Sequence, residues 1–188
     1  MQVQGMPKIY DASQGCEFSN RKIVFDTNVW IAIDGFDPRP DLTAYSDFYA
    51  AAKRQGNSIV VNDDILGELF NRACRIQYDL VYDDDPTKRK FKTRRQLAEF
   101  KDFMETVRDT CLNILDDCEY EHALEPACDL RPYLHEAGTG TIDLSDIVIR
   151  QHCQAKGYVI VSHDADFATC GLDFVTANQK VLRGNRQR

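Results

Sequence analysis

The segment KIVFDTN (residues 22–28) contains a short, largely apolar run that ends abruptly in polar residues. Residues 22–25 are rich in β-branched and aromatic side chains, which is typical of a strand. Residues 26–28 (DTN) are of the types that start helices, and an apolar stretch follows at 29–33. The segment therefore predicts a strand whose carboxyl end leads directly into a helix.

The same alternation recurs along the chain. Further apolar runs predict strands at 58–61, 158–161 and 172–175. Apolar residues at helical spacing predict helices at 42–54, 65–73, 97–118 and 145–157. Short continuous apolar strands separated by helices are typical of a parallel sheet that is covered on both faces. We predict an α/β fold with a single doubly wound parallel sheet flanked by helices.

Two regions depart from this alternation. Residues 1–20 show no periodicity and predict an N-terminal arm, which leaves 21–188 as the domain. Residues 79–140 form an enlarged middle region, helical at 97–118 and irregular over 119–140. With 188 residues, the chain has the length of one domain with appendages.

Composition narrows the function classes. The net charge of −7 argues against a globally basic nucleic-acid-binding protein. Seven cysteines form no CxxC pair, which favours reduced thiols over a zinc site or a disulfide framework. No stretch reaches the roughly 18 apolar residues of a membrane helix, and no secretion signal is evident. We expect a cytoplasmic protein.

Carboxylates follow the predicted strands at the edge where parallel sheets bind ligands. Asp26 follows the first strand and Asp164 and Asp166 follow the third, while Asp146 begins the preceding helix. Glu68 lies about 8 Å along its helix at 1.5 Å per residue, so its side chain can reach back to the sheet. Clustered carboxylates repel one another unless a cation joins them, and oxygen ligands suit Mg²⁺ or Mn²⁺. Each acid taken alone is also compatible with a turn, a helix cap or a solvated surface position.

A basic run, KRKFKTRR, occupies residues 88–95. Lys88, Arg89 and Lys90 are candidates for phosphate contacts that position a nucleic-acid strand. The run follows an acidic triplet at 83–85 and a proline, which also fits an exposed loop that compensates its own charge.

Four stretches of the sequence resemble the PIN-domain nucleases, the fold of VapC-type toxins and of several RNA-processing endonucleases. The matching stretches are IVFDTNVWI (23–31), VVNDDILGELFNR (60–72), DLSDIVIRQHCQAKGYVIVSHDADF (143–167) and FVTAN (174–178). They follow the family order and cover about half of the chain. The resemblance implies a divalent-metal site that cuts single-stranded RNA by hydrolysis.

The resemblance also assigns roles by position. It implies that the catalytic, metal-binding acids are Asp26, Glu68, Asp146 and Asp164, with Asp166 as an additional metal ligand and Asp143 as a spare carboxylate. Thr27, Asn28 and Ser162 match the family's polar residues beside these acids and are predicted to contact the substrate. Among partners, the resemblance leaves open an antitoxin protein and a homodimer. The enlarged middle region weakens the toxin assignment more than the nuclease assignment.

Two other functions remain as alternatives. A phosphatase of the haloacid-dehalogenase type needs a second Asp two residues after the first, where this chain has Asn28. A non-catalytic PIN-like module that binds RNA or protein would be expected to lack one or more of the acids, yet all four positions are filled.

Overall fold

The computed structural model describes residues 7–37, 42–82 and 90–186, and these contain one sheet of six strands. All neighbouring strands are parallel, in the order β1-β6-β5-β2-β3-β4. The strands are β1 (Ile9–Asp11), β2 (Lys22–Phe25), β3 (Ser58–Asn62), β4 (Glu119–Glu121), β5 (Val159–Val161) and β6 (Phe174–Thr176). After β2 the chain builds β3 and β4 on one side, and it later returns to build β5 and β6 on the other. The strand order therefore reverses beside β2, where sheets of this type form their binding crevice.

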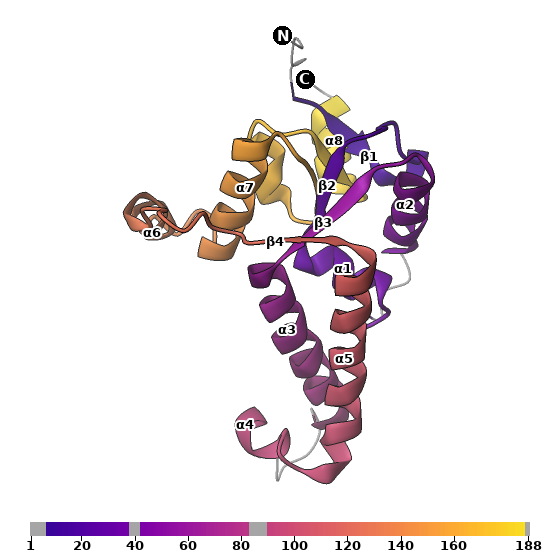
Figure 1. Cartoon of the computed structure of the whole chain (residues 1–188), viewed down its shortest axis with the longest axis vertical. Coiled ribbons are helices and arrows are strands. Elements are labelled where there is room, and N and C mark those ends of the chain that lie inside the picture. Colours follow the sequence, from indigo (N-terminus) through magenta and orange to yellow (C-terminus); the bar gives the residue numbers. More distant parts are fainter. Residues whose placement is uncertain (1–6, 38–41, 83–89, 187–188) are drawn as a thin grey trace.

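Helices lie on both sides of the sheet, with α7 on one side of the strands and α2 on the other (Figure 1). The α-helices are α1 (Thr27–Ile33), α2 (Thr43–Arg54), α3 (Asp63–Tyr82), α4 (Phe91–Arg94), α5 (Ala98–Asp117), α6 (Arg131–Ala137), α7 (Leu144–Lys156) and α8 (Gln179–Arg186). Two short 3-10 helices are η1 (Ala12–Gln14) and η3 (Ala165–Thr169). This architecture confirms the predicted doubly wound α/β fold. No helix in the described ranges is long and apolar enough to cross a membrane.

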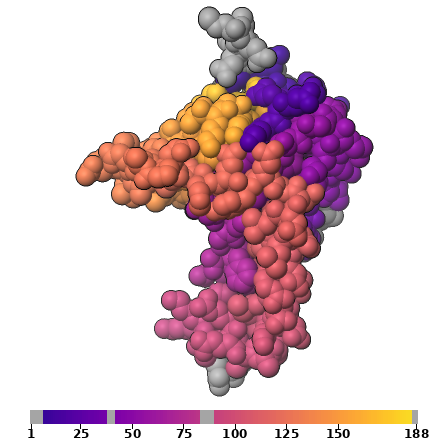
Figure 2. Space-filling view, in the orientation of Figure 1, coloured from indigo at the N-terminus to yellow at the C-terminus, as the bar shows by residue number. Residues whose placement is uncertain are grey.

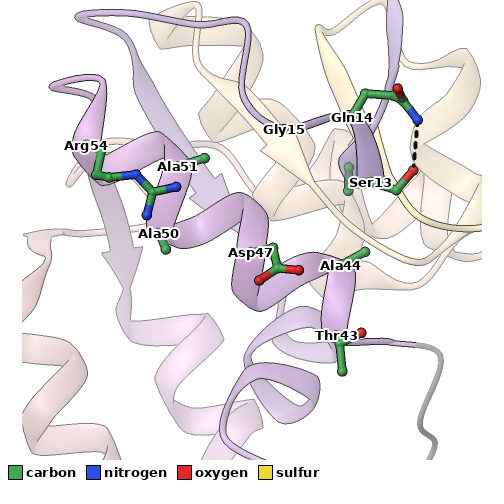
Figure 3. Close-up of a pocket in the computed structure, with 10 residues that line it drawn as sticks. Ser13, Gln14, Gly15, Thr43, Ala44, Asp47, Ala50, Ala51 and Arg54 are labelled. Atoms are coloured by element: carbon green, nitrogen blue, oxygen red, sulfur yellow. Dashed lines mark hydrogen bonds between the residues drawn. The ribbon is translucent and has the colours of Figure 1, made fainter.

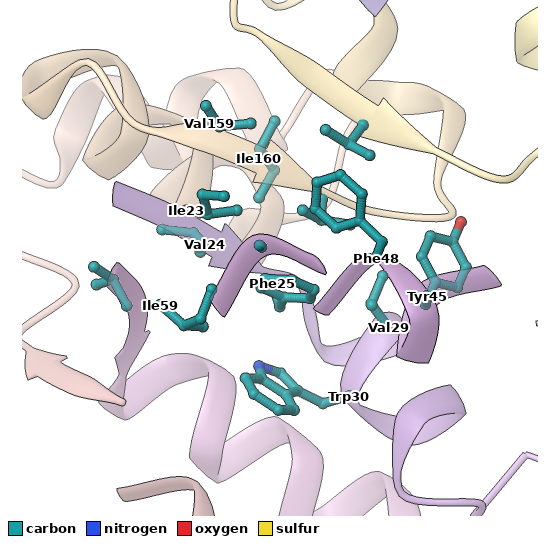
Figure 4. Packing of buried hydrophobic residues seen from close by; sticks show 14 of the residues in the cluster. Ile23, Val24, Phe25, Val29, Trp30, Tyr45, Phe48, Ile59, Val159 and Ile160 are labelled. Atoms are coloured by element: carbon teal, nitrogen blue, oxygen red, sulfur yellow. The ribbon is translucent and has the colours of Figure 1, made fainter. Parts of the chain in front are cut away.

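The main core surrounds β2, because its apolar residues 23–25 are fully buried between the two helical layers. The Phe25 ring lies 5.5 Å from Trp30 and 6.1 Å from Phe48, centroid to centroid, so it joins α1 to α2 (Figure 4). Burying such rings stabilises the sheet by roughly 2–3 kcal/mol for each side chain. This core fixes the carboxyl end of β2, which carries Asp26.

A second cluster of buried residues lies outside the sheet, between α3 and α5. The two helices project together from the strands and α4 lies at their far end (Figures 1 and 2). We call α3, α4 and α5 the arm. Its buried residues are Ala73, Cys74, Tyr78, Tyr82, Phe100 and Val107.

The structure corrects the predicted N-terminal arm, since Ile9–Asp11 of the segment 1–20 forms the edge strand β1. β1 pairs with β6 in parallel and is half-buried throughout. A three-residue strand with partial burial has no extended apolar run, and for this reason the sequence pattern did not indicate it.

The structure also corrects the region 119–140, which was expected to be irregular. It contains β4 and α6. β4 is polar and largely exposed, so it lacks the apolar signal of a strand. Charge holds it in place instead, because Lys22 Nζ of β2 lies 2.6 Å from Glu119 and 2.9 Å from Glu121.

Candidate metal centre

Asp26 lies at the carboxyl end of β2 and caps α1, and only 3% of its surface is exposed. Its Oδ1 accepts a hydrogen bond from the Thr27 backbone N–H at 2.6 Å. Its Oδ2 accepts bonds from Asn28 Nδ2 and from Ser162 Oγ, both at 2.6 Å. A carboxylate has about four lone-pair sites, so these three bonds fix its orientation and leave room for one further ligand.

The turns after β2 and β5 brace each other around this carboxylate. The Asp164 backbone N–H donates to Ser162 Oγ at 2.9 Å, and the His163 backbone N–H donates to Asn28 Oδ1 at 2.9 Å. Asn28 Nδ2 also reaches Ser162 Oγ at 3.1 Å. These bonds fix the position of the two strand ends relative to each other, and Asp26 therefore lies next to the turn that carries Asp164.

Thr27 and Ser162 are fully buried, which corrects their prediction as substrate contacts. Thr27 Oγ1 donates to Glu68 Oε2 at 3.1 Å, just as Ser162 donates to Asp26. Both hydroxyls therefore orient the acids rather than face a ligand. Asn28 does line the pocket described below.

Glu68 comes from α3, which begins where β3 ends. Asn62 stabilises this start, since its Oδ1 accepts the Ile65 backbone N–H at 2.9 Å. Glu68 lies five residues into the helix and is half-buried. Its Oε1 lies 3.4 Å from Arg72 Nη1, one helical turn further along.

Three further acids meet at the end of β5. One carboxylate oxygen from each of Asp146, Asp164 and Asp166 lies within 4.8 Å of the other two. Asp146 is in the first turn of α7, and Asp164 caps η3 by accepting the Asp166 backbone N–H at 3.1 Å. Five side chains from four separate segments, Asp26, Glu68, Asp146, Asp164 and Asp166, are thus collected at one edge of the sheet.

Four of these acids, all except Asp166, line a pocket of about 350 Å³, which we call the acidic pocket. Its lining residues are Asp26, Asn28, Glu68, Arg72, Asp143, Ser145, Asp146 and Asp164. Five of the eight are carboxylates. Arg72 and Ser145 were not anticipated from the sequence. The signal for Arg72 was its position four residues after Glu68 on the same helix face.

The crowding of carboxylates shifts their pKa values. Burial, with the added charges of Glu68 and Asp164, raises the pKa of Asp26 to about 6, although the bonds from Ser162 and Thr27 oppose this rise. Burial and the surrounding acids, first among them Asp26, raise the pKa of Asp146 to about 7. Burial and the Asp164 charge also raise the pKa of Asp166. The ionised forms of these acids are thus destabilised by burial and by their mutual repulsion.

This donor set fits a hard divalent cation. Its lining offers carboxylate oxygens and no histidine or cysteine, which suits Mg²⁺ or Mn²⁺ and does not suit zinc. A bound cation would relieve the repulsion that raises the pKa values of Asp26 and Asp146. Asp146, Asp164 and Asp166 together could hold one ion, and Asp26 has one lone-pair site left for a shared ligand.

The described part of the basic run, residues 90–95, does not line this pocket. Lys88 and Arg89 lie outside the described residues. Lys90 is exposed and precedes α4 at the far end of the arm, and it is not among the lining residues.

A second hollow, of about 550 Å³, lies between η1 and α2 (Figure 3). Its titratable lining residues are Asp47 and Arg54, and it shares no residue with the acidic pocket. Small side chains such as Ala50 and Ala51 form much of its wall. With a single carboxylate it offers no comparable cation site, so the acidic pocket is the candidate centre.

The fold and the acidic pocket at the strand ends define an α/β protein with a carboxylate centre. The family model of the PIN domain matches residues 23–171, and the chain belongs to this family. Among solved structures, VapBC2 from Rickettsia felis bound to a promoter DNA fragment is 17% identical, with 81% of this chain and 96% of that chain covered and a TM-score of 0.47. PAE2754 from Pyrobaculum aerophilum is 11% identical, with 91% and 96% covered and a TM-score of 0.48. No curated protein matches the chain.

Proposed function

We propose that this protein is a divalent-metal-dependent endoribonuclease that hydrolyses phosphodiester bonds of single-stranded RNA in the acidic pocket. The observation that carries the proposal is the gathering of five carboxylates around one pocket of about 350 Å³. Membership of the PIN domain family supports the nuclease class. All the acids expected for metal binding and catalysis are present, which favours an enzyme over a non-catalytic binding module.

Asp26, Asp146, Asp164 and Asp166 would hold Mg²⁺ or Mn²⁺, with Glu68 beside them. When bound, such ions polarise the phosphate, lower the pKa of an attacking water and stabilise the leaving oxygen. The chain's own contribution is positioning. Thr27 holds Glu68 at 3.1 Å, where its carboxylate can orient a water molecule or accept its proton. Arg72, on the rim, offers a guanidinium to a substrate phosphate.

The direct test is cleavage of labelled single-stranded RNA by the purified protein with Mn²⁺ and with a chelator. Asp26→Asn removes one charge from a repulsive cluster and keeps the side-chain shape, so this variant should fold and lose cleavage by at least about 100-fold. The exposed Asp116 of α5 provides a matched control, because Asp116→Asn also removes one negative charge.

Cleavage that requires the metal and Asp26, and does not require Asp116, is the expected result. Equal cleavage by the wild type and Asp26→Asn would reveal a contaminating ribonuclease or a wrong site. Metal-dependent binding of RNA without any cleavage would favour the non-catalytic module. Release of inorganic phosphate from small phosphate esters, without RNA cleavage, would favour another phosphohydrolase.

The proposal extends to a biological role as the toxin of a toxin–antitoxin pair, with an antitoxin protein as partner. Its basis is the resemblance of residues 23–31 and 143–167 to VapC-type toxins. Such a toxin would act on RNA in the cytoplasm. Induced expression in a bacterial host should stop growth with the wild type and not with Asp26→Asn.

We also propose that the protein forms a homodimer. Light scattering of the purified protein tests this oligomeric state.

A further inference from the structure

The arm carries a group of basic side chains at its far end. We call this group the tip cluster. It consists of Arg75 in α3, Lys90 just before α4, Lys92 within α4 and Arg95 just after α4. All four residues are exposed. Within the part of the chain that the structure describes, none of their nitrogens has a carboxylate oxygen within 4.0 Å. Four such cations stand out among the described residues of a protein whose net charge is −7.

Aromatic packing holds two of these cations in place. The Arg75 guanidinium lies 5.2 Å from the centre of the Phe91 ring, and that of Arg95 lies 5.9 Å from the same ring. Phe91 in turn packs edge-on against Tyr78 of the arm core at 5.5 Å. The two guanidinium groups are therefore presented by a packed element, which lowers the entropy lost when they bind an anion.

The tip cluster is continuous with the acidic pocket along α3. Glu68, Arg72 and Arg75 lie at i, i+4 and i+7, on one face of the helix. Glu68 and Arg72 line the pocket, whereas Arg75 belongs to the tip cluster. Asp79 continues this face and is engaged in an interaction of its own.

The distance between the two sites follows from the helix. Arg75 lies about 10 Å beyond Glu68 and Tyr82 about 21 Å beyond it, at 1.5 Å per residue. Tyr82 is the last residue of α3 and lies at the end of the arm. There the Arg94 guanidinium lies 4.3 Å from the centre of the Tyr82 ring. Figure 2 shows a hollow on one flank of the molecule. The helices α6 and α7 lie on one side of this hollow and the end of the arm lies on the other, and α3 also borders it.

We propose that the tip cluster is a second phosphate-binding site for the RNA strand that is cut in the acidic pocket. This inference rests on the proposed function. At about 3.4 Å per phosphate in a stacked strand, the span of 10–21 Å corresponds to about three to six nucleotides. The substrate is therefore an RNA that extends about three to six nucleotides or more from the scissile phosphate. The tip cluster offsets the repulsion between the RNA and the acidic body of the protein, and it raises the effective concentration of the strand at the pocket.

The test compares the binding of labelled oligouridylates of about 4 and about 12 nucleotides in Mg²⁺. All proteins carry Asp26→Asn, so that cleavage does not interfere. The parent should bind the long RNA at least about 10-fold more tightly than the short one. Arg75→Gln, Lys92→Gln and Arg95→Gln together should reduce this ratio about 10-fold. They should also lower the slope of log affinity against log salt by about 2 for the long RNA.

Two further variants control the experiment. Lys8→Gln, Lys180→Gln and Arg183→Gln remove the same charge just before β1 and in α8, and both elements lie at the opposite end of the molecule from α4 (Figure 1), so this variant should preserve the ratio. Lys90→Gln with Lys92→Gln removes two cations that stack on no described ring, so it tests the tip cluster without disturbing the packing of Phe91.

An unchanged ratio in both tip variants, or an equal loss in the control variant, would overturn the proposal. Absence of binding by either RNA would overturn it as well. Cleavage by the wild type is measured separately. If the tip cluster causes a preference for long RNA and the wild type cleaves no RNA, the proposed nuclease activity is contradicted. The phosphate-binding role of the tip cluster is supported in that case.

Discussion

At the scale of single residues, the acidic pocket stores electrostatic repulsion. Burial and neighbouring acids raise the pKa of Asp146 to about 7 from its ordinary value near 3.8. Because the folded state holds the proton more tightly than the unfolded state, ionisation of Asp146 costs stability. That cost is absent below about pH 4, grows as the pH rises, and is complete above about pH 7.

Asp146→Asn should therefore raise the melting temperature at pH 8 in chelator, by roughly 2–4 °C, or about 1 kcal/mol after solvent screening. At pH 4 the wild type and the variant should melt at nearly the same temperature. Thermal unfolding at the two pH values, with Asp116→Asn as the control, measures the difference. A gain of the same size at both pH values would show that the ionisation of Asp146 is not its source.

The sequence placed two of the candidate acids directly, because each of them follows an apolar strand. Asp26 and Asp164 could be placed in this way, since the carboxyl ends of parallel strands share one edge. The roles of Thr27 and Ser162 could not be predicted. Whether a hydroxyl faces a ligand or a neighbouring carboxylate depends on side-chain packing between two turns 135 residues apart, which no local pattern records.

At the scale of elements, the edge strand β4 depends on charge more than on apolar burial. Glu121 accepts bonds from Lys22 Nζ and Tyr158 OH at 2.9 Å each, and from Lys156 Nζ at 2.8 Å. Burial acts to raise the pKa of Glu121, yet the bonds from Lys156, Lys22 and Tyr158 outweigh it and lower the pKa to about 2. This carboxylate joins β4 to β2, to β5 through the adjacent Tyr158, and to α7.

Glu121→Gln should destabilise the protein by roughly 1–3 kcal/mol at pH 7, because it removes charge-assisted hydrogen bonds. The folded pKa lies below the unfolded value near 4.5, so the stabilisation is present above that pH and is lost as the pH falls toward 2. Urea unfolding at pH 7 and pH 3 measures this change. Glu119→Gln, on the same strand and more exposed, should cost less than about 1 kcal/mol. Equal costs for the two variants would contradict the role given to Glu121.

The elements that were predicted correctly carry apolar runs, as β2, β3 and β5 do. β1 and β4 lie at the two edges of the sheet, where burial is partial and an apolar pattern is absent. The length of α3 was also underestimated, because its last turns are stabilised by contacts with α5. Tyr78 and Tyr82 are buried in the same cluster as Phe100, which lies far away in sequence.

At the scale of the whole molecule, opposite charges are separated in space. Carboxylates surround the pocket at the sheet edge, and the tip cluster lies at the far end of the arm. The sequence contains both groups, but its net charge of −7 conceals their separation. The direction of α3, which leads from Glu68 to Arg75, determines this separation and is visible only in the fold.

Titration with Mn²⁺, followed by the paramagnetic resonance signal of the ion, shows whether the acidic pocket binds a divalent cation. We predict saturable binding by the wild type, weakened at least about 10-fold in Asp146→Asn and unaffected in Asp116→Asn. The measurement needs no substrate, so it does not depend on which RNA is cut. Absence of binding, or equal binding by the wild type and Asp146→Asn, would contradict the metal centre.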